Sequence, residues 1–315
     1  MRRAIPGFPH LSARPVPAPS SVADVPDLTL LFERAREAVS RLPRQVIRPA
    51  RSVRIHERGI HGRRRAGPGD SFWQFRHYHA GEPAYRIDWR RSARSEHLYV
   101  RQQEWETSRI LWIACDLSAS MNYRSRKDLE TKLEAALTLV FAAAVLGWQM
   151  GELIGVAGIP GRPFAASARR RLIAAFARAL EAGDSDAFDT FAATRLPPHG
   201  RAILVSDFLL PPARLERLLA RLAEARIATS LVRVEDPAER DFPFTGRVRI
   251  EGLEGEAPLL LENAGMARDE IDARLAAHAR GLQALAMARG ARLVTLGTDR
   301  PLADRVLSLA GLLAQ

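Results

Sequence analysis

The chain has 315 residues, 47% of them hydrophobic, which is enough for a buried core in one large or two ordinary domains. Its single cysteine, Cys115, excludes a disulfide framework within the chain, and we expect a small buried core residue in a reducing compartment. The net charge of +11 is concentrated between residues 41 and 109, where there are 16 arginines and 7 acidic residues, and this excess implies an acidic partner.

The first hundred residues divide into a leader and a basic module. Residues 1–26 are rich in proline and lack an apolar centre, which is typical of a disordered leader and not of a signal peptide. Apolar residues at helical spacing predict a helix over 28–42. We expect this helix and the Arg-, His-, Gly- and Trp-rich stretch after it to form one N-terminal module over 27–108.

From residue 109 onward, apolar strand candidates alternate with helix candidates. We expect strands at 110–115, 152–157, 202–206, 228–234 and 291–297, and helices at 126–149, 165–181, 211–225 and 301–313. A hairpin over 246–251 and 257–262, followed by a long helix over 266–289, is expected as an insertion near 236–263. The alternation predicts an α/β fold over 109–315, a doubly wound and mostly parallel sheet covered on both faces.

The most apolar segment of the chain is too short for a membrane span. Residues 135–148 are broken by Thr138 and Gly147 and preceded by Lys132 and Glu134. A spanning helix needs roughly 18 consecutive apolar residues. We therefore expect a buried core helix here, no membrane span, and a cytoplasmic protein.

Two of the predicted strands end in acidic residues. Asp116 follows "ILWIAC", with Ser118 and Ser120 at alternate positions after it, and Asp207 follows "AILVS". Ligands of doubly wound sheets bind outside the carboxyl ends of the strands, so both acids face one crevice if their strands are neighbours. Carboxylate and hydroxyl oxygens suit a hard cation such as Mg²⁺. The alternative is that these residues only cap strand-to-helix turns.

At these residues the chain resembles known families. "DLSASM" and "LVSDF" resemble the metal-ion-dependent adhesion motif (MIDAS) of the von Willebrand factor A domain. Upstream, "GPGDSFWQFRHYHAGEPAYRIDWRRSAR" is similar to the signature of a bacterial family, domain of unknown function 58 (DUF58). The matching residues are Gly67, Gly69, Phe72, Arg76, Tyr78, Gly81, Arg86, Ile87, Asp88, Trp89, Ser92, Ala93 and Arg94. With "DPAERDFPFTGRV" and "TDRPL" further on, the resemblance covers roughly residues 55–313.

The resemblance implies a von Willebrand factor A-like domain with Mg²⁺, or another divalent cation, at Asp116, Ser118, Ser120 and Asp207. It also implies partners. Proteins of the DUF58 family are commonly associated with MoxR-type AAA+ ATPases in a chaperone-like system that matures other complexes. The cation is then expected to bind an acidic residue of the ATPase or of an acidic protein client.

One element of the adhesion motif has no clear counterpart. The motif usually includes a threonine on a separate loop, and the corresponding region here reads "EAGDSDAFDTF". The residues that can replace it are Asp184, Ser185, Asp186 and Thr190.

The arginines of the signature block have two interpretations. Arg86, Arg90, Arg91 and Arg94 either form ion pairs within the module or contact a partner or a phosphate, since arginine suits bidentate contacts. We favour partner contact for the exposed arginines and a structural role for Asp88 and Trp89.

Two other functions remain open. Arginines interleaved with Trp73, Trp89 and Trp105 in residues 41–109 are compatible with nucleic-acid binding, although core tryptophans are the simpler interpretation. A metal-dependent hydrolase is less favoured, because serines stand where such enzymes supply carboxylates. The sequence contains no P-loop, G-x-S-x-G, H-E-x-x-H or Cys/His dyad, so we recognise no catalytic constellation and expect no enzyme.

Overall fold

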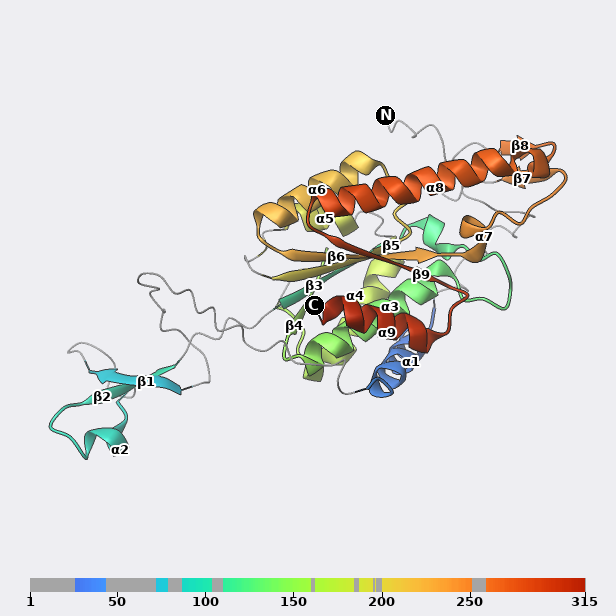
Figure 1. Cartoon of the computed structure of the whole chain (residues 1–315). Coiled ribbons are helices and arrows are strands. Elements are labelled where there is room, and N and C mark those ends of the chain that lie inside the picture. The colour runs from blue at the N-terminus through green and yellow to red at the C-terminus, as the bar shows by residue number, and fades with distance from the viewer. Residues whose placement is uncertain are drawn as a thin grey trace. The chain divides into compact units, whose positions relative to one another are not determined.

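The computed structural model describes residues 26–43, 72–78, 87–103, 110–159, 162–183, 187–194, 196, 200–250 and 259–314 (Figure 1). The chain forms two compact units. The larger comprises residues 1–51 and 109–315, and the smaller comprises residues 52–108.

The larger unit is built on a five-stranded parallel sheet. Its strands are β3 (Ile110–Cys115), β4 (Leu153–Val156), β5 (Arg201–Ser206), β6 (Ala228–Glu235) and β9 (Arg292–Gly297). They lie in the order β4-β3-β5-β6-β9, and every neighbouring pair is parallel. These strands confirm the predicted parallel α/β sheet. The chain leaves β3 for β4 on one side and returns to β5 on the other, so the strand order reverses between β3 and β5.

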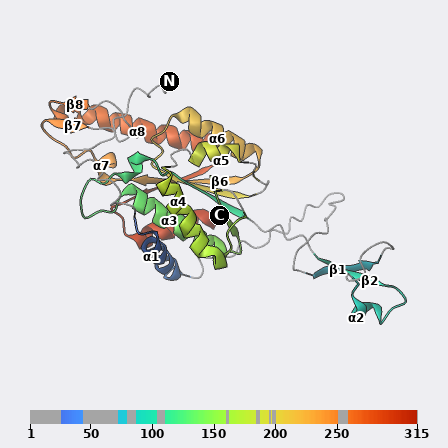
Figure 2. The same cartoon turned by 180° about the vertical axis from the view of Figure 1, so that it is seen from behind.

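Helices cover both faces of this sheet (Figures 1 and 2). One face is covered by α1 (Leu28–Ser40), α3 (Lys132–Gln149), α4 (Arg169–Glu181) and α9 (Leu302–Leu313). The other is covered by α5 (Ala187–Ala193), α6 (Pro212–Glu224) and α8 (Ala264–Ala288). Each face has its own hydrophobic core, as expected for a doubly wound arrangement.

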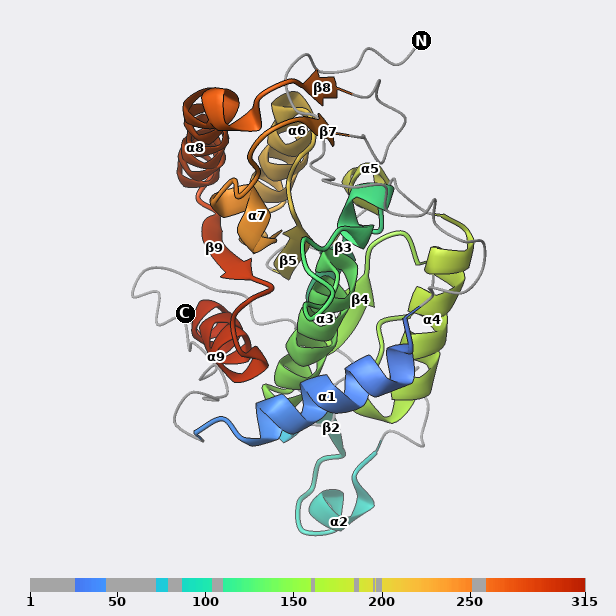
Figure 3. The ribbon, with the colours of Figure 1, turned by 90° about the vertical axis from the view of Figure 1, so that its right-hand side faces the viewer.

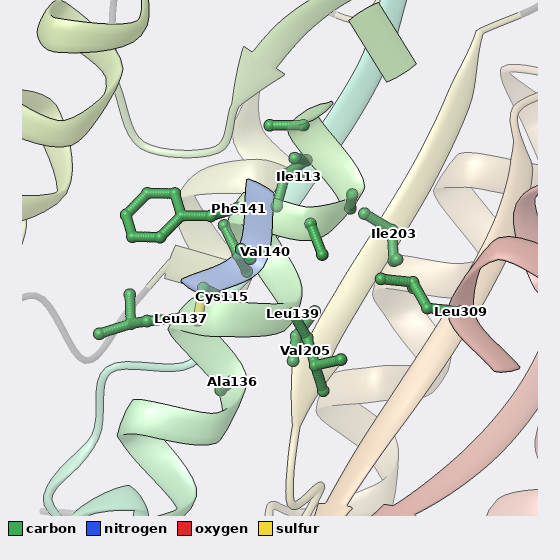
Figure 4. Close-up of a cluster of buried hydrophobic side chains, with 14 of the residues drawn as sticks. Ile113, Cys115, Ala136, Leu137, Leu139, Val140, Phe141, Ile203, Val205 and Leu309 are labelled. Atoms are coloured by element: carbon green, nitrogen blue, oxygen red, sulfur yellow. The ribbon is translucent and has the colours of Figure 1, made fainter. Parts of the chain in front are cut away.

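Helix α3 is the centre of the larger core. Figure 4 shows Leu137 and Phe141 of α3 among Ile113 and Cys115 of β3 and Val205 of β5. Among the described residues, α3 is the one helix whose length and apolar composition would allow it to cross a membrane. However, 83% of it is buried inside the protein. Its apolar length is therefore explained by its position against the sheet.

Helix α3 begins at Lys132 and not near residue 126. The Thr131 side chain accepts a hydrogen bond from the Glu134 backbone, and the Glu134 side chain accepts one from Thr131 in return, which is a capping box. Short 3₁₀ turns, η2 (Ala119–Asn122) and η3 (Ala166–Ala168), precede α3 and α4.

Helix α1 lies on the larger unit, which differs from the expected grouping with residues 43–108. It packs on α3 and α9, beside which it lies in Figure 3. The ring centroids of Phe32 and Phe141 are 5.5 Å apart. An amphipathic helix of this kind needs an apolar partner, and α3 supplies it. The helix was assigned to the N-terminal module because it precedes that module in the sequence, whereas its packing partners come from the larger unit.

The described part of the smaller unit contains an antiparallel pair, β1 (Phe72–His77) and β2 (Tyr99–Gln103). Between them lies one turn of helix, α2 (Trp89–Ser92), whose N-cap is Asp88. The Asp88 carboxylate accepts a hydrogen bond from the backbone N–H of Arg91 at 2.9 Å and so caps this turn.

The insertion is also present. The short helix α7 (Pro237–Arg240) follows β6, and β7 (Val248–Ile250) pairs antiparallel with β8 (Leu259–Leu261) ahead of α8. Phe242, Val248, Ile250 and Ala264 form a small separate core. Figures 1 and 2 both place α7 and this hairpin at the carboxyl end of β6.

Candidate functional site

The two acids predicted to share a crevice follow neighbouring strands. Cys115 of β3 is in register with Val205 of β5, and the Asp116 backbone N–H continues the ladder by donating to the Val205 carbonyl at 2.9 Å. Asp116 and Asp207 therefore both lie at the switch point, outside the carboxyl ends of β3 and β5. This is where open α/β sheets bind their ligands.

The Asp116 carboxylate is held by hydrogen bonds from both loops of the switch point. Its Oδ1 accepts the backbone N–H of Ser118 at 2.9 Å, and its Oδ2 accepts the hydroxyl of Ser206 at 2.6 Å. Ser206 Oγ in turn accepts the backbone N–H of Phe208 at 2.8 Å. Ser206 thus connects the two loops, and the sequence analysis did not identify it.

The serine hydroxyls do not act as helix caps. Ser118 is the N-cap of η2, but its side chain makes no capping hydrogen bond. Instead, the hydroxyls of Ser118 and Ser120 hydrogen-bond each other at 2.9 Å. Asp207 does not cap α6 either, because the N-cap of that helix is Pro211. Helix capping therefore does not explain these three side chains, although Asp116 and Asp207 each accept a backbone N–H two residues further along their own turns.

The surroundings of Asp116 oppose the ionisation of its carboxyl group. Burial is the largest cause that raises its pKa, the neighbouring Asp207 raises it further, and the hydrogen bonds from Ser206 and Ser118 oppose the rise in part. Within the part of the chain that the structure describes, no basic side chain pairs with Asp116. As whole residues, Asp116 and Ser118 are half-buried.

Asp207, in contrast to Asp116, is paired with a basic side chain of the protein. Its Oδ1 accepts the backbone N–H of Leu209 at 2.9 Å, and its Oδ2 lies 2.8 Å from Nζ of Lys132. The same ammonium lies 2.5 Å from Oε1 of Glu239 in α7. Burial disfavours the charged form of Lys132, but Asp207 and Glu239 outweigh it and raise the pKa of the ammonium above its ordinary value. Neither Lys132 nor Glu239 was predicted as a site residue.

On the α8 side of the sheet, further polar groups adjoin the switch point. Ser206 is in register with Arg233 of β6, whose guanidinium lies 3.0 Å from a carboxylate oxygen of Glu235. His278 of α8 hydrogen-bonds the Phe208 backbone. Its pKa is lowered mainly by burial and further by Arg233, while Asp207 and the hydrogen bond act in the opposite direction. Phe208 itself has a left-handed backbone, with φ of 56°.

The donor chemistry around Asp116 fits a hard cation. A carboxylate has about four lone-pair sites, of which Asp116 uses two in the contacts above, and the two serine hydroxyls offer further oxygens. The described residues contain no group of three or more His, Cys, Asp or Glu side chains arranged to hold an ion. Since one oxygen of Asp207 is bound to Lys132, an ion here depends mainly on the Asp116 loop.

The other predicted contact residues are only partly described. Arg90, Arg91 and Arg94 are exposed, and the Arg91 guanidinium lies over the Tyr99 ring at 5.6 Å. Arg86 lies outside the described residues. Trp89 is 61% exposed and is therefore not a core residue.

Of the four residues proposed for the third loop of the adhesion motif, the structure describes Thr190. It is exposed on α5. Asp184, Ser185 and Asp186 lie outside the described residues. No further ligand can thus be assigned from this loop.

Comparison with known proteins identifies the family. The family model described as "Protein of unknown function DUF58" matches residues 74–281. The chain belongs to the DUF58 family. It is 29% identical over 257 residues to the uncharacterized proteins Mb1516 of Mycobacterium bovis and Rv1480 of Mycobacterium tuberculosis, with 78% of this chain and 80% of each relative covered.

Among solved structures, the conserved hypothetical protein BatB from Bacteroides thetaiotaomicron aligns with 64% of this DUF58 chain and 96% of its own. The TM-score is 0.38 and the sequence identity is 16%.

Proposed function

We propose that this DUF58 protein is a von Willebrand factor A-like interaction module whose switch-point site holds a divalent cation, with Mg²⁺ as the first candidate. The observation that supports this is Asp116, a carboxylate with a raised pKa, two hydroxyls on its own loop and no basic partner among the described residues. A bound cation supplies the missing positive charge and an open position for an acidic group.

In this proposal the residues of the site have different roles. Asp116, Ser118 and Ser120 would hold the ion, directly or through water. Asp207 would act mainly through its charge, because Leu209 and Lys132 already engage its two oxygens. Ser206 would orient Asp116 through its 2.6 Å hydrogen bond.

The proposed partner is a MoxR-type AAA+ ATPase, which together with this protein would act on an acidic protein client in the cytoplasm. The partner is inferred from the family resemblance. The chemistry of the site agrees with it, since hydroxyl ligands leave the ion electrophilic enough to attract a carboxylate from outside. The same ligand set favours binding over hydrolysis, because among the described residues the carboxylates proposed for the ion are those of Asp116 and Asp207, whereas hydrolases supply several.

The test is binding of a purified MoxR-type ATPase from the same organism to wild type and Asp116→Ala at one fixed Mg²⁺ concentration. We expect Asp116→Ala to bind at least about tenfold more weakly and to lose Mg²⁺ binding in calorimetric titration. The matched control is Asp269→Ala, which removes an exposed carboxylate from α8.

Unchanged ATPase binding by a folded Asp116→Ala variant contradicts the proposal. Binding to nucleic acid with a steep salt dependence, independent of Asp116, would favour the alternative in which residues 41–109 contact phosphates.

A further inference from the structure

The ammonium of Lys132 lies in a buried cage at the carboxyl edge of the sheet. Lys132 is 1% exposed, and its Nζ contacts Asp207 at 2.8 Å and Glu239 at 2.5 Å. The Tyr123 ring lies 5.7 Å from the same nitrogen and completes the enclosure. A lysine is almost never fully buried unless it is paired.

The position of Lys132 in its helix is unfavourable without these carboxylates. It is the first residue of α3, where the helix dipole repels a positive charge. The capping box of Thr131 and Glu134 fixes this first turn, so the ammonium is presented from a rigid element. The lysine is therefore explained by what it binds and not by helix stability.

The other side of the cage is also fixed. Asp236 caps α7, with its Oδ1 accepting the Ala238 N–H at 2.9 Å, and its Oδ2 accepts the Ser125 N–H at 2.9 Å. The Asp236 backbone N–H donates to Oε2 of Glu239 at 3.1 Å, which leaves Oε1 for Lys132. Glu239 thus has one oxygen bound to its own helix and the other bound to the ammonium.

Two carboxylates, those of Asp207 and Glu239, come together here around one lysine. Asp207 raises the pKa of Glu239 and also that of Asp116, so it links this cage electrostatically to the Asp116 loop. Burial is the largest cause of both rises, and Lys132 is the largest opposing influence on Glu239. Without Lys132, the mutually repelling carboxylates of Asp207 and Glu239 would share one buried region.

We propose that Lys132 is an internal cation that takes the place of a metal ion between Asp207 and Glu239. It keeps the loop after β5 and helix α7 together in the absence of any bound ion, and it confines a divalent cation to the Asp116 loop. Lys132 is a positioning residue for the site in this sense. Removing the ammonium should convert the cage into a divalent-cation site formed by Asp207 and Glu239.

The test is thermal unfolding of Lys132→Met, first in EDTA and then in Mg²⁺ or Mn²⁺. In EDTA we expect the melting temperature to fall by roughly 10 °C, because two buried carboxylates lose their partner. Either ion should restore most of this loss and raise the melting temperature by more than it does in wild type. Calorimetry should show Mn²⁺ binding to the variant at least about tenfold more tightly than to wild type.

Two further variants make the result specific. Lys127→Met removes the only other lysine of the chain, which is exposed, and should leave both the stability and the ion response unchanged. Lys132→Met/Glu239→Gln removes one carboxylate as well, so it should be less destabilised in EDTA than Lys132→Met and should lose the restoration by ions.

A loss of stability in Lys132→Met that neither ion restores overturns the proposal, and so does failure of this variant to fold even when it is prepared with ions. In those cases Lys132 is an ordinary buried ion pair. The inference rests on the site of the proposed function, but no partner enters the test. Ion binding by Lys132→Met with none by wild type would support the role of Lys132 and contradict the proposed cation site.

Discussion

At the carboxyl end of β3, the fold opposes ionisation of the side chain that the sequence most clearly marks as functional. Asp116 lies beside Asp207, and the Lys132 ammonium is bound to Asp207 and Glu239. A protein that placed this carboxylate only to end a strand would gain nothing from leaving it without a basic partner. We therefore interpret the cost of this charge as the property on which binding depends.

The raised pKa of Asp116 predicts how stability depends on pH. A carboxyl whose pKa is higher in the folded than in the unfolded protein binds its proton more tightly when folded. Stability therefore falls as pH rises from the unfolded value of about 4 through the raised folded pKa. In EDTA, Asp116→Asn should be more stable than wild type at pH 8 by an amount on the order of 1 kcal/mol, and the difference should shrink toward pH 4.

Urea unfolding of both proteins at several pH values measures this difference. A variant that is less stable than wild type at pH 8 would show that the hydrogen bonds of the ionised carboxylate outweigh its burial.

The predictable part of the site is local in sequence. Asp116, Ser118, Ser120 and Asp207 are visible because each stands just after an apolar strand. Lys132 contacts Asp207 across 75 residues of chain, Ser206 contacts Asp116 across 90, and Glu239 contacts Lys132 across 107. Ser206 and Glu239 stand inside the family-like stretches "LVSDF" and "DPAERDFPFTGRV", but their contacts with the site depend on these distant pairings. Charge compensation within a buried cluster is a property of the tertiary structure, so it had to be read from contacts.

At the scale of elements, α1 is attached by one aromatic side chain in particular. Phe32 is 2% exposed and contacts the rings of Phe141 and Trp148, at centroid distances of 5.5 and 6.3 Å. Phe32→Ala should lower the free energy of unfolding by about 3–5 kcal/mol, the usual cost of emptying a buried phenylalanine site. Leu30→Ala, on the same helix but 56% exposed, should change it by less than about 0.5 kcal/mol.

Chemical denaturation of the two variants measures both values. Equal small effects would show that α1 contributes little to the core of the larger unit.

The sheet was predictable because its strands are short continuous apolar runs, whereas the segments between them have apolar residues at helical spacing. The boundaries of the helices were harder to predict. The predicted helix over 126–149 loses its first turn and a half because Thr131 and Glu134 form a capping box, a signal that is present in the sequence. Helix α5 was missed altogether, although Phe188 and Phe191 stand three residues apart and are both buried. Its apolar stripe is too short to outweigh the polar residues before it.

At the scale of the whole molecule, the division into two units predicts independent folding of the larger one. Its described core is made of α1, the five-stranded sheet and the helices on both faces, all from residues 26–43 and 110–314. A chain in which residues 52–108 are replaced by a flexible Gly/Ser linker should unfold cooperatively, within about 5 °C of the full chain. The proposed function further predicts that the shortened and the full chain bind Mg²⁺ equally.

Differential scanning calorimetry and ion titration of the two chains test this. Loss of a cooperative transition in the shortened chain would show that the smaller unit stabilises the larger one. The same chain, tested against the ATPase, separates the contribution of the exposed arginines Arg90, Arg91 and Arg94 from that of the switch point.

The single thiol of the chain has a practical consequence. Cys115 is buried in the inner strand β3, directly before Asp116, and burial raises its pKa above the ordinary value. A thiol reagent can therefore react with it only when β3 opens to solvent. The rate of labelling reports the frequency of that opening. The native chain thus contains one reactive probe adjacent to the site. An ion or partner that keeps β3 closed should slow the labelling of this thiol, so its binding can be detected without any engineered label.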